Sequence, residues 1–138
     1  MKTNWTDSVD RNNPLNEYPR PQLARRGWRC LNGQWDYAIN DSSRHPTAFD
    51  GQITVPFSPE SALSGVERQL KSGQYLWYRR QVELPEDYAG KRVLLHFGAV
   101  DQEATVWVNS MMVASHVGGY LPFEADVTDA IENGMMTI

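Results

Sequence analysis

Residues 103–123 read EATVWVNSMMVASHVGGYLPF, and this stretch carries the clearest structural signal in the chain. We expect a β-strand from Glu103 to Val108, because β-branched and aromatic residues dominate this segment. Asn109-Ser110 follows, and residues 112–116 return as a second strand. Serine lacks the freedom that glycine has at positive φ, so we expect a weaker or longer turn than Asn-Gly would form. The stretch therefore predicts an antiparallel hairpin.

Short strand patterns also occur on both sides of this hairpin. We expect strands at residues 34–39, 52–55, 74–84, 92–97 and 123–127, with a hairpin turn at Asn32-Gly33. Single helical turns are expected at residues 60–63 and 129–133, the second capped by Thr128. Many short strands without a long helix predict an all-β fold, an antiparallel β-sandwich of jelly-roll type. Because residues 137–138 only begin a strand, we expect this sandwich to lack its last strands and to leave a sheet edge open.

The chain divides by composition into an arm and one domain. Residues 1–25 contain three prolines, whose fixed φ disfavours both helix and internal strand. We therefore expect an extended proline-rich arm there and the β-sandwich over residues 26–138. A chain of 138 residues has the usual size of a single domain.

Charge and composition exclude several classes of partner. The net charge is −4, and Lys and Arg are scattered, so no basic face is expected for nucleic acid. No apolar run reaches the roughly 18 residues that span a membrane, and residues 1–11 lack a secretory pattern, so we expect a cytoplasmic protein. Cys30 is the only cysteine, which excludes a disulfide within the chain and a zinc site of several cysteines. We interpret Cys30 as a small core residue, and no metal or cofactor is expected.

Paired acids are the first candidates for chemistry. Asp101 and Glu103 stand two residues apart, and on an extended strand such residues share one face about 6.5 to 7 Å apart. Two carboxylates at about this spacing can act on a glycosidic bond. Nothing in the sequence marks either acid as buried, so the favoured interpretation is a turn residue and a solvated side chain. No Ser-His-Asp arrangement and no phosphate loop are readable, and we expect no catalytic residue in this chain.

The segment His116–Phe123 and the aromatic residues are the second candidates. His116 precedes two glycines and could bond a ligand hydroxyl, although a hydrogen bond to a loop carbonyl is the simpler interpretation. Five aromatic residues could stack on a sugar ring, and we expect one or two of them near a ligand: Trp28, Trp35, Trp77, Trp107 and Tyr120. Trp35 and Trp107 fall in strand patterns and are expected in the core.

An ordered series of short motifs resembles the amino-terminal sugar-binding domain of family 2 glycoside hydrolases, the β-galactosidase and β-glucuronidase group. The motifs are residues 31–37 (LNGQWDY), 53–57 (ITVPF), 78–80 (YRR), 96–102 (HFGAVDQ), 106–109 (VWVN), 116–123 (HVGGYLPF) and 126–128 (DVT). The resemblance runs from about residue 13 to the end. It implies a jelly-roll domain that packs on an immunoglobulin-like domain and a (β/α)₈ barrel, with both catalytic glutamates in the barrel.

The resulting hypothesis is a non-catalytic part of a retaining exo-β-glycosidase, β-galactosidase-like first and β-glucuronidase-like next. Asp101, His116 and Tyr120 are the predicted substrate contacts, and a carbohydrate is the predicted ligand. Two alternatives stay open: a self-sufficient carbohydrate-binding module, suggested by the aromatic residues, and a scaffold for subunit contacts in a homo-oligomer, suggested by the arm and the open edge.

Overall fold

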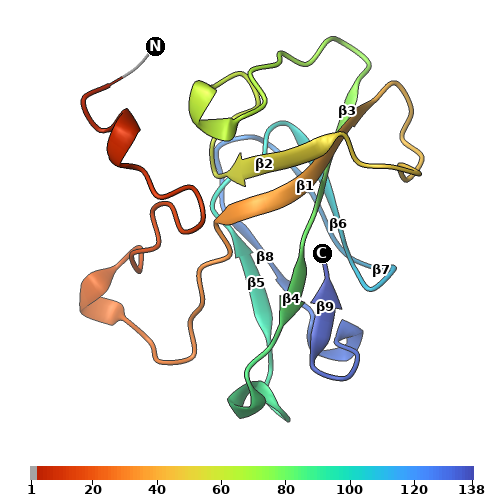
Figure 1. Cartoon of the computed structure of the whole chain (residues 1–138). Coiled ribbons are helices and arrows are strands. Elements are labelled where there is room, and N and C mark those ends of the chain that lie inside the picture. Colours follow the sequence, from red (N-terminus) through yellow and green to blue (C-terminus); the bar gives the residue numbers. More distant parts are fainter. Residues whose placement is uncertain (1–2) are drawn as a thin grey trace. The chain divides into compact units, whose positions relative to one another are not determined.

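A computed structural model describes residues 3–138 and contains only β-strands and short 3₁₀ turns within that range (Figure 1). Every strand pair is antiparallel, as predicted, and the fold belongs to the β-sandwich class. The chain divides into two compact units, Met1–Arg80 and Gln81–Ile138. The sequence predicts another boundary, between an arm and a domain after residue 25, and this boundary stays a prediction.

The first unit is built around β1 (Gly33–Asn40). This strand pairs with β2 (Gly51–Val55) on one side and with β3 (Tyr75–Arg79) on the other. Three apolar side chains of β1 are buried, those of Trp35, Ala38 and Ile39. Ile53, Thr54 and Ser64 are also buried in this unit.

The segment before β1 has no strand among its described residues. It contains two 3₁₀ turns, η1 (Thr6–Ser8) and η2 (Pro21–Leu23). Side-chain amides tie this segment to the start of β1: Gln34 donates to the Arg11 carbonyl at 3.1 Å, and Asn32 donates to the Pro14 carbonyl at 3.1 Å. The polar amide groups therefore hold a segment whose large apolar side chains, Trp5, Leu15 and Leu23, stay mostly exposed.

The predicted hairpin at Asn32-Gly33 is wrong. Residues 27–32 form no strand, and Gly33 is the first residue of β1, opposite Val55 of β2. Its φ is +119°, and a Cβ at this position would overlap the carbonyl oxygen of Asn12. The glycine is needed because another segment of backbone lies against it, and not because the chain reverses there.

The predicted long strand at residues 74–84 is interrupted at Arg80. β3 ends at Arg79, and β4 (Gln81–Glu83) pairs with β9 (Met135–Thr137) instead of β1. The Arg80 guanidinium donates to the carbonyls of Leu31 at 2.6 Å and Asn32 at 2.9 Å. These bonds hold the Arg80 side chain at the point where one strand ends and the next begins.

The second unit is a long ribbon folded back on itself. Its strand pairs are nested: β4 with β9, β5 (Leu94–Phe97) with β8 (Phe123–Asp126), and β6 (Glu103–Val108) with β7 (Met111–Val117). These strands run from green to blue in Figure 1. Nested antiparallel pairing is the pattern of a jelly roll. Among the buried residues of this unit are Val82, Val93, Leu95, Val106, Val108, Ala125, Val127 and Met136.

The sequence predicts a weaker or longer turn between β6 and β7. The turn has two residues, so the longer turn is wrong, while a weaker turn stays a prediction. Asn109 and Ser110 both have positive φ, 46° and 70°. The Asn109 side chain donates to the carbonyls of Ala130 (2.8 Å) and Met135 (3.0 Å) and accepts from the Thr137 amide (2.8 Å). The turn is therefore bonded to the chain around β9 by a side chain that tolerates left-handed backbone.

Further 3₁₀ turns lie at η3 (Ala62–Ser64), η4 (Glu86–Tyr88) and η5 (Thr128–Ala130). Thr128 does not cap η5 as predicted, because Val127 holds the capping position without a side-chain bond. Instead the Thr128 hydroxyl donates to Asp126 at 2.6 Å and accepts from the Val93 amide at 2.9 Å.

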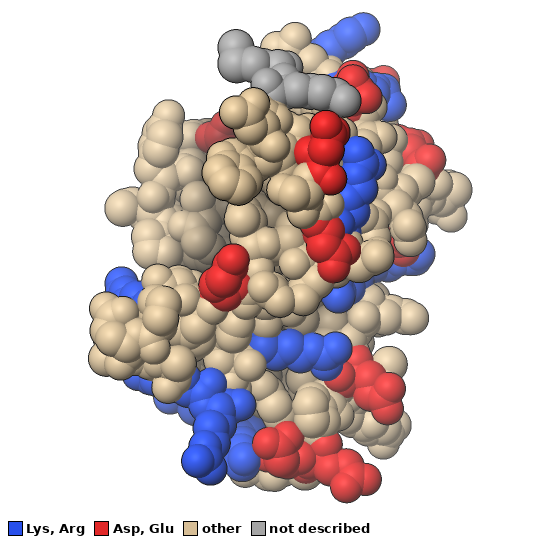
Figure 2. Space-filling view, turned by 60° about the vertical axis from the view of Figure 1, so that its left-hand side comes forward, with Lys and Arg blue, Asp and Glu red and all other residues tan. Residues whose placement is uncertain are grey.

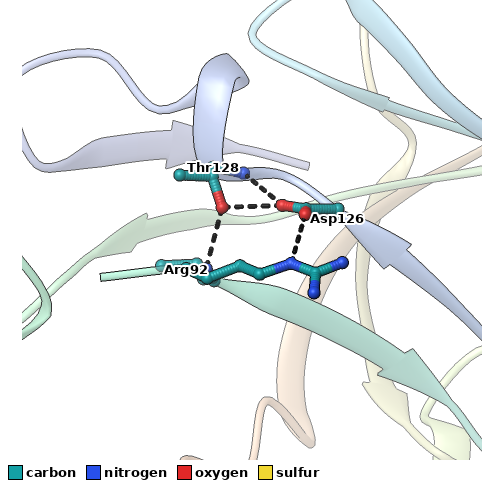
Figure 3. A network of polar contacts seen from close by, with 4 residues as sticks. Arg92, Asp126 and Thr128 are labelled. Atoms are coloured by element: carbon teal, nitrogen blue, oxygen red, sulfur yellow. Dashed lines mark hydrogen bonds and ion pairs between the residues drawn. The ribbon is translucent and has the colours of Figure 1, made fainter. Parts of the chain in front are cut away.

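Asp126 is the centre of this polar network, which Figure 3 shows. One carboxylate oxygen accepts from the Thr128 hydroxyl and amide, and the other accepts from Arg92 Nε at 2.6 Å. These bonds, with the Thr128 hydroxyl as the largest contribution, lower the pKa of Asp126 from 3.8 to about 2. The network joins the chain just before β5 to the end of β8.

Two predictions of buried residues are also corrected. Trp107 is 39% exposed, because the inward positions of β6 are those of Ala104, Val106 and Val108. Cys30 is half-buried, since the segment before β1 lies at the surface. Trp35 is buried as predicted, and its indole nitrogen donates to the Leu31 carbonyl at 2.8 Å.

Candidate functional site

The end of the β6–β7 ribbon brings two distant sequence motifs together. Beyond the pair Glu103–Val117, the Gly118 amide donates to the Gln102 carbonyl at 2.8 Å. This bond continues the pairing by one residue and sets Asp101 beside Gly119. The register of the hairpin therefore brings Asp101 and Gly119 together, although they are far apart in the sequence.

Asp101 lies directly against the backbone of Gly119. A Cβ on Gly119 would overlap Asp101 Oδ1 and would lie 3.0 Å from its Cγ and 3.1 Å from its Cβ. Glycine, which has no Cβ, leaves room for the Asp101 carboxylate in this position. The Gly-Gly pair also includes Gly118 with φ +123°, a value that favours glycine. Both glycines are thus required by the local geometry.

His116 is held by ring stacking. Its imidazole stacks on Phe123 with centroids 4.5 Å apart, and Phe123 stacks in turn on Phe97 at 4.7 Å. Its Nε2 atom is buried and has no hydrogen-bond partner among the described residues. The predicted bond to a loop carbonyl is therefore wrong for this nitrogen, and the ligand contact of His116 stays a prediction.

Tyr120 projects into solvent from the loop after β7. Its side chain is 95% exposed, and the next residue, Leu121, is 68% exposed. An exposed ring with a hydroxyl at its tip can cover an apolar sugar face and also donate or accept a hydrogen bond. Asp101, His116 and Tyr120 therefore lie at the same end of one hairpin, although their binding role stays a prediction.

The chemistry available at this end is binding by acceptors and an aromatic ring. Asp101 is exposed and can accept bonds from hydroxyl groups, whereas Glu103 points to solvent on the outer face of the ribbon.

Within residues 3–138, no group of three or more His, Cys, Asp or Glu side chains could hold a metal ion. No helix in that range is long and apolar enough to cross a bilayer. Figure 2 shows basic and acidic residues interspersed on the face in view.

Sequence reasoning missed the contact between Asp101 and Gly119 and the role of Asn109. Two consecutive glycines at 118–119 indicate a backbone conformation that other residues rarely adopt. The residue that lies against Gly119 is Asp101, which precedes β6 and is far away in the sequence. Asn109 was interpreted as a turn residue only. Its bonds to the last strand depend on the position of residues 130–137, which no local pattern specifies.

Comparison with known proteins identifies the family. Residues 66–138 match the family described as glycosyl hydrolases family 2, sugar binding domain. The chain belongs to this family. The match covers β3 to β9, which includes the whole β6–β7 ribbon and the site at its end.

Curated relatives of this family member are β-glucuronidases. The β-glucuronidase of Felis catus is 33% identical over 133 residues, which is 85% of this chain and 20% of that protein. The β-glucuronidase of Paenibacillus borealis is 30% identical over 120 residues, 80% of this chain and 20% of that protein. The chain therefore spans about one fifth of the length of the relatives it matches.

Solved structures of β-glucuronidases resemble the fold. The enzyme of Faecalibacterium prausnitzii is 34% identical with a TM-score of 0.58, over 78% of this chain and 20% of that one. The Ruminococcus gnavus enzyme in complex with D-glucuronic acid is 25% identical with a TM-score of 0.63, over the same shares. These relatives support the predicted glycosidase family, but they do not support β-galactosidase as the first expectation.

Proposed function

We propose that this chain is the non-catalytic sugar-binding part of a β-glucuronidase-type exo-glycosidase of family 2. The names of the relatives support glucuronides as the substrate class. Hydrolysis of the glycosidic bond then belongs to residues outside this chain. The role of the chain is to contribute one wall of the substrate pocket.

The observation that carries this proposal is the place of Asp101 against Gly119. The carboxylate is fixed where the backbone leaves room for it, and it still faces solvent. It accepts hydrogen bonds from sugar hydroxyls, while the Tyr120 ring covers an apolar face of the sugar. Such a site orients a sugar and contains no acid–base pair.

The outer face of the ribbon supports a place within a larger assembly. Trp107 (39% exposed) lies opposite Met112 (62%), and Val117 (69%) follows on the same strand. Apolar residues gathered on a sheet face mark a surface that another domain covers. The chain spans about one fifth of the length of these relatives. We assign this face to contacts with further domains, which the family resemblance suggests are an immunoglobulin-like domain and a barrel.

Enzyme kinetics on the complete polypeptide test the proposal. The longer coding sequence should specify a barrel with an Asn-Glu pair, and the expressed protein should hydrolyse p-nitrophenyl β-D-glucuronide faster than the galactoside. Asp101→Ala should raise KM about tenfold, because one hydrogen bond to a charged group is lost. Asp87→Asn is the matched control, since Asp87 is an exposed acid of η4, outside the β6–β7 ribbon, and should leave KM unchanged.

Two results would contradict the proposal. A continuing sequence without a barrel would remove the assignment to a glycosidase. A higher kcat/KM for the galactoside would reject the glucuronide class while leaving the family unchanged.

A stand-alone carbohydrate-binding module is the second candidate, favoured by the 95% exposure of Tyr120. Calorimetric titration of the 138-residue chain with methyl β-D-glucuronide would support it if heat of binding appeared and was lost in Tyr120→Ala. A homo-oligomer and a cytoplasmic location stay predictions, which light scattering and cell fractionation would test.

A further inference from the structure

The first unit contains an open cavity that the sugar site at Asp101 does not use. Its volume is about 370 Å³, within the range of small-molecule pockets, about 300–1,000 Å³. Amide and guanidinium groups dominate the lining, together with one indole. The residues concerned are Asn12, Asn13, Asn16, Trp28, Arg29 and Arg80.

Several of these groups are held in place by the fold. Arg80 is fixed by its bonds to the carbonyls of Leu31 and Asn32. The Trp28 ring packs edge-on against Tyr18, with centroids 5.0 Å apart. The Asn32 amide bonds the Pro14 carbonyl at 3.1 Å and so ties down the segment that carries the asparagines. Arg80, Trp28 and Asn32 are therefore in place before a ligand arrives, whereas the Asn12, Asn13, Asn16 and Arg29 side chains are exposed around the opening.

The electrostatics of the cavity favour an anion. Burial and the nearby positive charge of Arg29 lower the pKa of Arg80. None of the lining residues that the structure describes is acidic. Two guanidinium groups that share one cavity repel each other, and a bound anion with oxygen acceptors relieves this repulsion.

The remaining lining groups match hydroxyls. Each asparagine amide offers both donors and an acceptor, which suits a hydroxyl that also donates and accepts. The indole of Trp28 offers an apolar face of the kind that packs on a sugar ring. We propose that this cavity binds a hydroxylated anion, namely an acidic sugar with a carboxylate or a phosphate group, at a site separate from the Asp101 site.

Titration of the 138-residue chain followed by two-dimensional amide NMR tests this proposal. The probes are D-glucuronate and glucose 6-phosphate, with D-glucose and inorganic phosphate as comparisons. At least one hydroxylated anion should shift the Trp28 indole and the Asn12, Asn13 and Asn16 side-chain amides, with an affinity at least about tenfold above both comparisons. Whichever of the two probes binds more tightly identifies the anionic group.

Variants locate the site. Arg29→Gln removes one charge, and Asn13→Asp places a like charge beside the ligand at an exposed position. Each should weaken binding about tenfold. Their matched controls are Arg26→Gln and Asn4→Asp, two exposed residues of the same segment outside the cavity, which should bind as the unaltered chain does.

Three results would overturn the proposal. Shifts confined to residues near Asp101 would mean that sugar binds only at the site of the proposed function. Inorganic phosphate that binds as tightly as glucose 6-phosphate would remove the role of the hydroxyls. Retained binding in both Arg29→Gln and Asn13→Asp would place the ligand elsewhere.

Discussion

Because Asp101 lies against Gly119, adding one methyl group at Gly119 should lower the stability of the fold. Gly119→Ala would push against the Asp101 side chain, and such overpacking costs about 1–3 kcal/mol. Gly98→Ala is the control, because a Cβ at Gly98 meets no atom within 4 Å. Its stability should change by no more than about 0.5 kcal/mol. Urea unfolding of both variants measures the difference, and equal midpoints would contradict the proposed close approach.

Tyr78 predicts a response to alkali in the first unit. Burial, and secondarily the charge of Glu60, raises the pKa of Tyr78 from 10.0 to about 12. Because the folded chain resists ionisation, the stabilising effect is complete below pH 10 and is lost as pH rises from 10 to 12. Ultraviolet titration should show one tyrosine ionising last, and Tyr78→Phe should remove that step. A chain in which all tyrosines ionise together near pH 10 would disprove it.

At the scale of elements, the turn between β6 and β7 stabilises the last strand as well as its own hairpin. Asn109→Ala removes three side-chain hydrogen bonds to residues 130–137 and leaves alanine at positive φ. The expected loss of unfolding free energy is about 3 kcal/mol. Thermal unfolding measures the loss, and amide hydrogen exchange should rise first at Thr137, whose amide donates to Asn109.

Ser110→Gly is the contrasting change in the same turn. The φ of Ser110 is 70°, and its side chain makes none of the bonds to β9 described for Asn109. Relief of left-handed strain should leave stability unchanged or raise it by up to about 1 kcal/mol. Equal destabilisation by both substitutions would show that the turn conformation matters and the Asn109 bonds do not.

At the scale of the whole molecule, the Asp126 network predicts a loss of stability in acid. The pKa of Asp126 is lowered to about 2 in the folded chain, so its stabilising effect is complete above about pH 4 and is lost as pH falls from 4 to 2. Thermal unfolding midpoints across this range should fall less steeply for Asp126→Asn than for the unaltered chain. Asp129→Asn is a control in the same region, and parallel curves for Asp126→Asn and the unaltered chain would contradict the prediction.

Much of the fold could be predicted because a strand is specified by its own residues. The strand predicted at residues 103–108 matches β6, and the short strands predicted at residues 52–55 and 92–97 lie close to β2 and β5. The candidate site could be predicted in part, since Asp101, His116 and Tyr120 flank one hairpin and a hairpin brings its flanks together. The contact of Asp101 with Gly119 could not be predicted. It depends on the register of β6 against β7 and on how closely the Gly119 backbone approaches the Asp101 side chain.

By itself, the sequence determined the all-β class, the positions of most strands, and membership of a glycosidase family through an ordered series of motifs. These follow from neighbouring residues, whose period and turn preferences are local. Only the tertiary structure decided that Asn32-Gly33 does not form a hairpin, that Arg80 interrupts a strand, and that β4 pairs with β9. Each of these depends on a partner from a distant segment. The Leu31 carbonyl comes within hydrogen-bond distance of Arg80, and β9 comes beside β4, only once the chain has folded.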